Sequence, residues 1–175
     1  MSKDRIEFKK YIREVADWPK KGILFRDITP LLAEPKVFQA AINAIAAGFV
    51  DTGIQYVGAV EARGFIFGSA VAEKLNAGFI PIRKKGKLPY KTVSITYDLE
   101  YGTDTLEVHC DAITAGAKVL MVDDLLATGG TMAGACKLIE KIGGQIAGIS
   151  FLIELMELGG INKLSGYKVK SIIRY

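Results

Sequence analysis

Two adjacent carboxylates, Asp123 and Asp124, stand between an apolar run and a loop of small residues. The run is Val119-Leu-Met-Val122, and the loop is Ala127-Thr128-Gly129-Gly130-Thr131. Backbone N–H groups in such a loop can close around a phosphate, and a helix that follows adds its positive N-terminal end. The carboxylates can accept hydrogen bonds from sugar hydroxyls. The segment therefore predicts a site for a sugar phosphate, to which Thr128 and Thr131 contribute hydroxyl groups.

Other known phosphate loops fit this segment less well. A Walker A loop needs a Gly-Lys-Ser/Thr sequence, which does not follow the glycines. The glycine spacing also differs from the dinucleotide-binding fingerprint, and neither motif places paired acids directly before the loop. The non-functional alternative is a tight turn that caps a helix, with both acids solvated. The long, ordered succession of strand, acids, small loop and helix favours a ligand site.

Apolar strands alternate with amphipathic helices along the chain, which predicts an α/β fold. This fold positions the acidic pair and its loop. The pattern predicts strands at 56–60, 79–82, 118–122, 146–155 and 169–173, with helices at 65–75 and 131–142. It is typical of a doubly wound, mainly parallel sheet with helices on both faces. Ligands bind such sheets at the carboxyl ends of the strands, which is where the acidic pair and its loop lie.

Two regions depart from this alternation. Apolar residues at helical spacing predict an amphipathic helix over 5–16, followed by a short extended segment at 23–25 and a helix that starts at Pro35 and ends near 51–53. Between 83 and 117 the helical spacing is absent, and 93–97 and 106–109 predict antiparallel strands joined by a turn at 101–104. A long excursion of this kind is typical of a functional lid. We expect one domain over 1–175, with an N-terminal helix and small hood at 1–34 and a flexible lid hairpin at 86–109.

The run from Val122 to Thr131 resembles the phosphoribosyl-pyrophosphate signature of the type I phosphoribosyltransferases. Four further blocks, at 22–30, 61–65, 83–89 and 99–102, match the adenine-specific members in the family's order and cover nearly the whole chain. The resemblance implies a purine salvage enzyme that transfers 5-phosphoribose from phosphoribosyl pyrophosphate to adenine, giving AMP and pyrophosphate. It also implies Mg²⁺ held mainly through the substrate, no metal site built by the protein alone, and a homodimer.

The resemblance further assigns roles to individual residues. The phosphoribosyl group is expected at Asp123, Asp124, Ala127, Thr128, Gly129, Gly130 and Thr131, and pyrophosphate at Arg63, Arg83, Lys84 and Lys87. Adenine is expected at Leu24, Phe25, Arg26 and Leu125, and the catalytic pair Glu100 and Tyr101 closes over the substrates. A cis peptide bond is implied at Glu61-Ala62. From the residues alone, Arg63 follows a strand and opens a helix, which favours anion binding. Each role has a non-functional alternative: 83–87 could be a solvated loop, Glu100 could be solvated, and 24–26 could be a strand that covers the core.

Composition narrows the class of protein. The chain has 175 residues, 50% hydrophobic and 24% charged, with a formal net charge of +4. No apolar stretch approaches the roughly 20 residues of a membrane helix, and the N-terminus has no signal-peptide core. Cys110 and Cys136 lie in unlike contexts, which indicates reduced thiols and a cytoplasmic protein. Basic residues cluster only at 83–87 without any nucleic-acid-binding motif, so we expect neither nucleic-acid nor membrane partners.

Two other functions stay open at this point. The acceptor could be another nucleobase, although the 22–30 block favours adenine. The chain could also be a non-catalytic regulator that senses phosphoribosyl pyrophosphate, although such proteins usually carry an added DNA-binding module.

Overall fold

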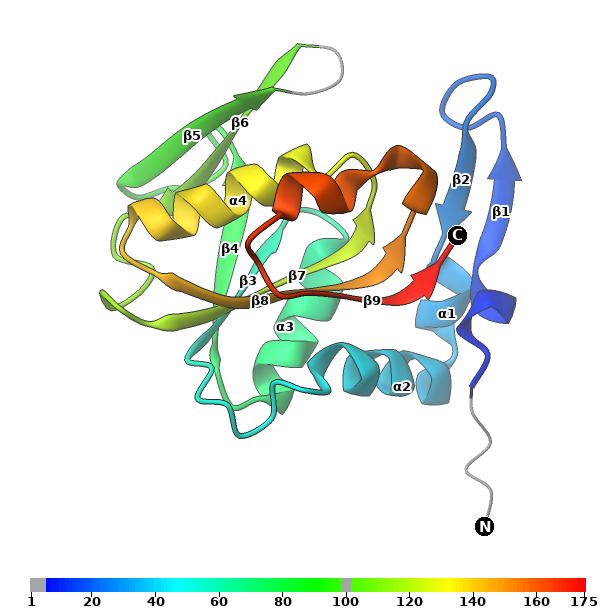
Figure 1. The fold of residues 1–175 in the computed structure, drawn as a ribbon, viewed down its shortest axis with the longest axis horizontal. Coiled ribbons are helices and arrows are strands. Elements are labelled where there is room, and N and C mark those ends of the chain that lie inside the picture. Colours follow the sequence, from blue (N-terminus) through cyan, green and yellow to red (C-terminus); the bar gives the residue numbers. More distant parts are fainter. Residues whose placement is uncertain (1–5, 99–101) are drawn as a thin grey trace. The chain divides into compact units, whose positions relative to one another are not determined.

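The computed structural model of the protein describes residues 6–98 and 102–175 (Figure 1). These residues form two compact units, divided between Ala44 and Ile45. The larger, C-terminal unit contains the central sheet, and the smaller unit contains a hairpin and short helices. No helix among the described residues is both long and apolar enough to cross a membrane.

The N-terminal unit begins with a short 3₁₀ helix, η1 (Phe8–Tyr11), and the strands β1 (Arg13–Ala16) and β2 (Leu24–Asp27). The amphipathic helix predicted over 5–16 is therefore wrong beyond Tyr11, and Arg5 lies outside the described residues. β1 pairs antiparallel with β2, from Arg13 opposite Asp27 to Ala16 opposite Leu24. This ladder satisfies the backbone groups that a helix would have paired, so tertiary pairing overrides the helical spacing. The extended segment predicted around Leu24 is confirmed.

Two helices follow, α1 (Thr29–Ala33) and α2 (Pro35–Ala46). Pro35 occupies the first position of α2 as predicted, and Val37, Ala41 and Ile45 form one buried stripe along it. The helix ends several residues before the predicted 51–53. Gly48 adopts a positive φ of 93° just after Ala46, a conformation that commonly terminates a helix.

Seven strands form the central sheet in the order β5-β6-β4-β3-β7-β8-β9. Five of them are parallel to one another: β3 (Tyr56–Val60), β4 (Gly78–Lys84), β7 (Lys118–Leu126), β8 (Gln145–Glu154) and β9 (Val169–Arg174). The hairpin of β5 (Thr92–Asp98) and β6 (Thr103–His109) adds two antiparallel strands beyond β4. The predicted mainly parallel α/β fold is confirmed, and the predicted lid strands extend the same sheet.

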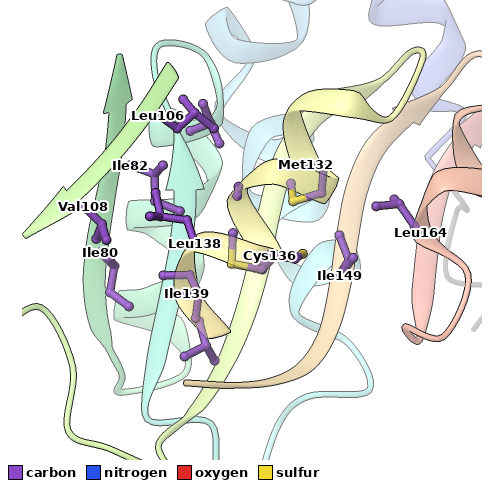
Figure 2. Close-up of a cluster of buried hydrophobic side chains, with 14 of the residues drawn as sticks. Ile80, Ile82, Leu106, Val108, Met132, Cys136, Leu138, Ile139, Ile149 and Leu164 are labelled. Carbon is purple, nitrogen blue, oxygen red and sulfur yellow. The ribbon is translucent and has the colours of Figure 1, made fainter. Parts of the chain in front are cut away.

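Helices α3 (Gly64–Lys74) and α4 (Gly130–Lys141) cover opposite faces of this sheet (Figure 1). Residues alternate between the two faces along each strand. The side of the sheet that packs on α4 carries a cluster of buried side chains from five strands, shown in Figure 2 with Ile80, Ile82, Leu106, Val108 and Ile149 labelled. On the α4 side the cluster includes Met132, Cys136, Leu138 and Ile139, and Leu164 comes from the 3₁₀ helix η3 (Gly160–Leu164). A further 3₁₀ helix, η2 (Met156–Leu158), precedes it.

Two predicted boundaries near the expected site are wrong. The strand predicted to end at Val122 continues to Leu126, because β7 stays paired with β8 as far as Leu126 opposite Glu154. Thr103 and Asp104, which were predicted to belong to a turn at 101–104, instead pair with Asp98 and Tyr97 in the hairpin.

Candidate active site

The carboxyl ends of three adjacent strands carry most of the predicted site residues. β3 lies between β4 and β7 and is parallel to both. Arg63 follows β3, Arg83 and Lys84 end β4, and Asp123 and Asp124 lie near the end of β7. Because these ends meet at one edge of the sheet, residues 60 positions apart in sequence contact one another there.

The acidic pair belongs to strand β7 rather than to the loop in which the sequence pattern placed it. Asp124 is only 5% exposed, and its Oδ2 lies 2.7 Å from Nη2 of Arg63. The Oδ1 of Asp123 accepts a hydrogen bond of 2.9 Å from the N–H of Asp124. A side chain at Gly64 would collide with Asp123, since its Cβ would lie 2.6 Å from that Oδ1. The glycine that opens α3 therefore gives Asp123 its space.

Burial raises the pKa of both carboxyls. The pKa of Asp123 lies well above its ordinary value because the group is buried and because the charge of Asp124 is beside it. The pKa of Asp124 is also raised by burial, although the positive charge of Arg63 opposes the shift. A positive charge that a ligand brought to this point would favour ionisation of both acids.

The small-residue loop spans Ala127 to Gly129, and α4 starts at Gly130. Gly129 has a positive φ of 78°, which favours glycine. A Cβ there would collide with the carbonyl oxygen of Gly160, and a Cβ at Gly160 would collide with the carbonyl oxygen of Ala127. The loop and the start of η3 thus approach each other backbone to backbone. Thr128, Gly130 and Thr131 are partly exposed around the start of α4, as an anion site at a helix N-terminus requires.

Four predicted cations lie at the ends of β3 and β4, and three of them form ion pairs with carboxylates. Besides the Arg63 pair, Nη2 of Arg83 lies 3.1 Å from Oε2 of Glu61, and Nζ of Lys84 lies 3.0 Å from Oδ2 of Asp104. The fourth, Lys87, is exposed, and its carbonyl oxygen accepts a 3.0 Å hydrogen bond from Arg83. The peptide bond Glu61-Ala62 is cis, which confirms the expectation for this segment.

These ion pairs shift the titration of their acids and bases. The hydrogen bond and charge of Asp104 raise the pKa of Lys84, and Lys84 in turn lowers the pKa of Asp104. Burial alone would raise the pKa of Glu61, but hydrogen bonds from the Lys84 N–H and the Arg83 guanidinium outweigh it and lower that pKa. Glu61, Lys84 and Asp104 are thus charged at neutral pH. The cations Arg83 and Lys84 can exchange their carboxylate partners for an anionic ligand.

The hairpin contacts the start of α4 through one strand, β5. The hydroxyl of Tyr97 in β5 lies 3.3 Å from Oγ1 of Thr131, in the first turn of α4. A Cβ at Gly134 would come within 3.1 Å of the Tyr97 ring, so the ring packs directly on the backbone of α4. Glu100 and Tyr101, the predicted catalytic pair, lie outside the described residues.

The predicted base-binding residues Leu24, Phe25 and Arg26 form most of β2. The ring of Phe25 packs edge-on against Trp18 with centroids 4.3 Å apart, and Arg26 pairs with Glu14 of β1. Leu125 lies in β7, between the acidic pair and the loop, and is partly exposed. That these residues enclose one adenine stays a prediction.

Comparisons with known proteins agree with this geometry. Residues 29–173 match the model of the phosphoribosyl transferase domain. An adenine phosphoribosyltransferase of Maridesulfovibrio salexigens is 54% identical over 97% of this chain and 99% of its own length. The chain belongs to the adenine phosphoribosyltransferase family.

Solved structures of this family have the same fold. The adenine phosphoribosyltransferase of Thermoanaerobacter pseudethanolicus has a TM-score of 0.93 and 50% identity, covering 97% of this chain and 98% of that one. The enzyme of Saccharomyces cerevisiae, solved with an imino-altritol bisphosphate and adenine, has a TM-score of 0.89 and 38% identity over 95% and 96% of the two chains.

Several residues that shape the site were missed from the sequence. Glu61, Asp104 and Glu107 fix the cationic segment, the last by accepting a 2.9 Å hydrogen bond from the Gly86 N–H. Gly64 allows the start of α3 to lie close to Asp123, and Gly160 allows the start of η3 to lie close to the loop. The adjacent glycines 159 and 160, shortly after the strand predicted at 146–155, were a usable signal for the second approach.

Proposed function

We propose that the chain transfers 5-phosphoribose from phosphoribosyl pyrophosphate to adenine, giving AMP and pyrophosphate in purine salvage. The observation that carries the proposal is the convergence of a glycine loop, an acidic pair and four cations at the ends of three parallel strands. The 54% identity to an adenine phosphoribosyltransferase over nearly the whole chain supports the same reaction.

The loop half of the site binds the sugar phosphate. Backbone N–H groups of Ala127 to Gly130, with the hydroxyls of Thr128 and Thr131, surround the 5′-phosphate at the start of α4. Asp123 and Asp124 accept hydrogen bonds from ribose hydroxyls. Displacement at the anomeric carbon develops oxocarbenium character, and the ionised carboxylates of Asp123 and Asp124 stabilise that positive charge.

The cations bind the leaving pyrophosphate. Arg63, Arg83, Lys84 and Lys87 lie around the ends of β3 and β4, and the first three are already oriented by carboxylates. Exposed ion pairs contribute only about 0–1 kcal/mol, so exchanging the Lys84–Asp104 pair, whose lysine side chain is 61% exposed, for a pyrophosphate oxygen costs little. This pair therefore holds Lys84 in position without competing strongly with the ligand.

Leu24, Phe25, Arg26 and Leu125 bind adenine, and Glu100 with Tyr101 closes over both substrates. Leu24 and Arg26 lie two residues apart in an extended strand, so their backbone groups point to the same edge. A carbonyl and an N–H on one edge match the amino group and N1 of adenine. The yeast relative solved with adenine supports a base pocket in this family.

Mg²⁺ binds mainly through oxygens of phosphoribosyl pyrophosphate. Within the described residues, no three His, Cys, Asp or Glu side chains gather into a metal site, so the protein offers at most the carboxylates beside the ribose. When bound, the ion would neutralise charge on the leaving group. We further propose that the enzyme acts as a homodimer in the cytoplasm.

Product analysis tests the reaction. Purified protein is incubated with phosphoribosyl pyrophosphate, Mg²⁺ and adenine, and AMP and pyrophosphate are quantified. We expect equal amounts of the two products. Binding of phosphoribosyl pyrophosphate without turnover would identify a sensor instead, and product only with another nucleobase would identify a different acceptor.

A further inference from the structure

A cavity of about 320 Å³ lies at the opposite end of the central strands from the candidate active site. It is lined by Gly48, Phe49, Thr52, Lys118, Gln145, Ile146, Ala147 and Lys168. Lys118 and Gln145 are the first residues of β7 and β8, and Lys168 directly precedes β9. Six residues of extended chain separate Lys118 from Asp124, which is roughly 20 Å. One small ligand cannot occupy both places.

The charge of this cavity is positive. Its lining includes two lysines and no acid, and no salt bridge joins Lys118 or Lys168 to any carboxylate of the described residues. Lys170 adds a third cation nearby, with its Nζ 2.6 Å from the carbonyl oxygen of Ala47. Burial and the charge of Lys168 both lower the pKa of Lys170. This differs from the active site, where carboxylates neutralise the cations.

A bulge in strand β8 and a glycine beside Phe49 shape the wall of the cavity. Val119 pairs with Ile146 but Leu120 pairs with Gly148, so Ala147 is an extra, bulged residue of β8. Bulges are frequent beside ligand sites, where they redirect the chain. A side chain at Gly148 would meet the Phe49 ring at 2.6 Å, so glycine is needed for the ring to pack there. Nζ of Lys168 lies 5.6 Å from the centroid of the same ring, which holds its charge at the cavity.

We propose that this cavity is a second binding site, for a small phosphorylated ligand of the nucleoside monophosphate class. The ammonium groups of Lys118 and Lys168 bind the phosphate, as lysines commonly do. Ile146, Ala147 and the edge of Phe49 contact the apolar part of the ligand, while Thr52 and Gln145 offer polar groups. The volume lies at the lower end of the range for ligand pockets, which suits a mononucleotide better than a dinucleotide.

Backbone amide NMR of the full chain tests the proposal, with AMP, inorganic phosphate and adenosine as separate probes. We expect AMP to shift the amides of Gly48, Ala147 and Gly148, in addition to those of the loop at 127–131. Phosphate alone should shift them at higher concentration, and adenosine should not. The proposal would be overturned if AMP did not shift the amides of Gly48, Ala147 and Gly148. It would also be overturned if sulfate at the same ionic strength shifted them equally.

Charge variants then locate the contact. Lys168→Ala should weaken AMP binding at Gly48 and Ala147 about tenfold, as expected for one lost charge-assisted contact. Lys137→Ala, which removes an equal charge from the exposed side of α4, should leave it unchanged. The shifts at 127–131 report in the same spectra that each variant is folded and still binds AMP. Equal affinity at the cavity in both variants would contradict the assignment.

Discussion

The two halves of the candidate active site are built in different ways. The loop half comprises Asp123, Asp124 and residues 127–131, where Asp124 is 5% exposed and the buried Gly129 lies against the Gly160 backbone. The cation half comprises Arg83, Lys84 and Lys87 at the end of β4, where the side chains of Arg83 and Lys84 are 33% and 61% exposed. Backbone packing holds the first half, and side-chain ion pairs hold the second.

This difference indicates how each half tolerates change. A backbone cradle has no free rotations, so one added methyl group displaces several N–H donors together. Exposed cations can re-orient, and neighbouring cations can replace one that is lost. We therefore expect substitutions in the loop half to affect the reaction more strongly than substitutions among the cations. Arg63 links the halves, because it belongs with the cations but pairs with Asp124.

The largest effect is expected for Gly129→Ala. The new Cβ would collide with the carbonyl of Gly160 and would also occupy a positive φ. Displacing the loop should lower kcat/KM for phosphoribosyl pyrophosphate by about 100-fold or more. Gly166→Ala is the matched control, because it has a positive φ of 96° but nothing within 4 Å of its Cβ. If both variants lose activity equally, the approach to Gly160 is not what matters.

A smaller loss is expected for Asp124→Asn. The substitution keeps the shape but removes one charged hydrogen-bond acceptor, worth about 1.5–3 kcal/mol, so kcat/KM should fall about 10- to 100-fold. Asp111→Asn, at an exposed position after β6, should behave as wild type. Steady-state kinetics with thermal melting as a folding check make the comparison, and wild-type kinetics for Asp124→Asn would exclude the ribose contact.

Arg63→Ala should weaken pyrophosphate binding about tenfold and AMP binding less, because AMP lacks the leaving group that we propose Arg63 contacts. Calorimetric titration of both ligands measures the difference. Arg174→Ala, which removes the partner of another buried acid, Glu154, serves as the control. Equal losses of AMP and pyrophosphate affinity for Arg63→Ala would place Arg63 outside the pyrophosphate site.

The smallest effect is a change of stability with pH for Asp123→Asn. Burial raises the pKa of Asp123 above its value in the unfolded chain. The contribution of Asp123 to the free energy of unfolding is therefore complete below the unfolded-state pKa and is lost as pH rises through the folded-state pKa. Asparagine does not ionise. The variant should therefore melt at a higher temperature than wild type at pH 7, and the difference should shrink toward pH 3. A constant difference across this range would show that Asp123 does not carry a raised pKa.

Much of the C-terminal unit could be predicted from the sequence, because the patterns that indicate its strands and its loop lie within short segments. The apolar runs of β3, β4, β7 and β8 and the small loop before α4 each lie within one short segment, and the structure confirms them apart from boundaries. The end of β7 was misplaced because pairing with β8 continues through two acids, and no local pattern reports that.

The N-terminal strands and the ion pairs could not be predicted from the sequence, because each depends on residues that are distant along the chain. The spacing of Phe8, Tyr11, Ile12 and Val15 fits one helix, and only the pairing of β1 with β2 makes residues 13–16 a strand. The partners Glu61, Asp104 and Glu107 are likewise visible only once the strands are assembled. Charges on separate strands carry no spacing that sequence alone can read.

The most direct test of the proposed function is the choice between adenine and hypoxanthine. Adenine presents an amino donor and an N1 acceptor, whereas hypoxanthine presents a carbonyl acceptor and an N1–H donor at the same places. A pocket formed by the Leu24 carbonyl and the Arg26 N–H would face two mismatched pairs, and backbone groups cannot rotate to repair them. Each buried, unpaired group costs about 1–3 kcal/mol.

The measurement is kcat/KM for each base at saturating phosphoribosyl pyrophosphate and Mg²⁺. A site of this kind should prefer adenine by roughly 10⁴–10⁵. Comparable values for the two bases would contradict recognition by the backbone of β2 and would leave a broader purine phosphoribosyltransferase in its place.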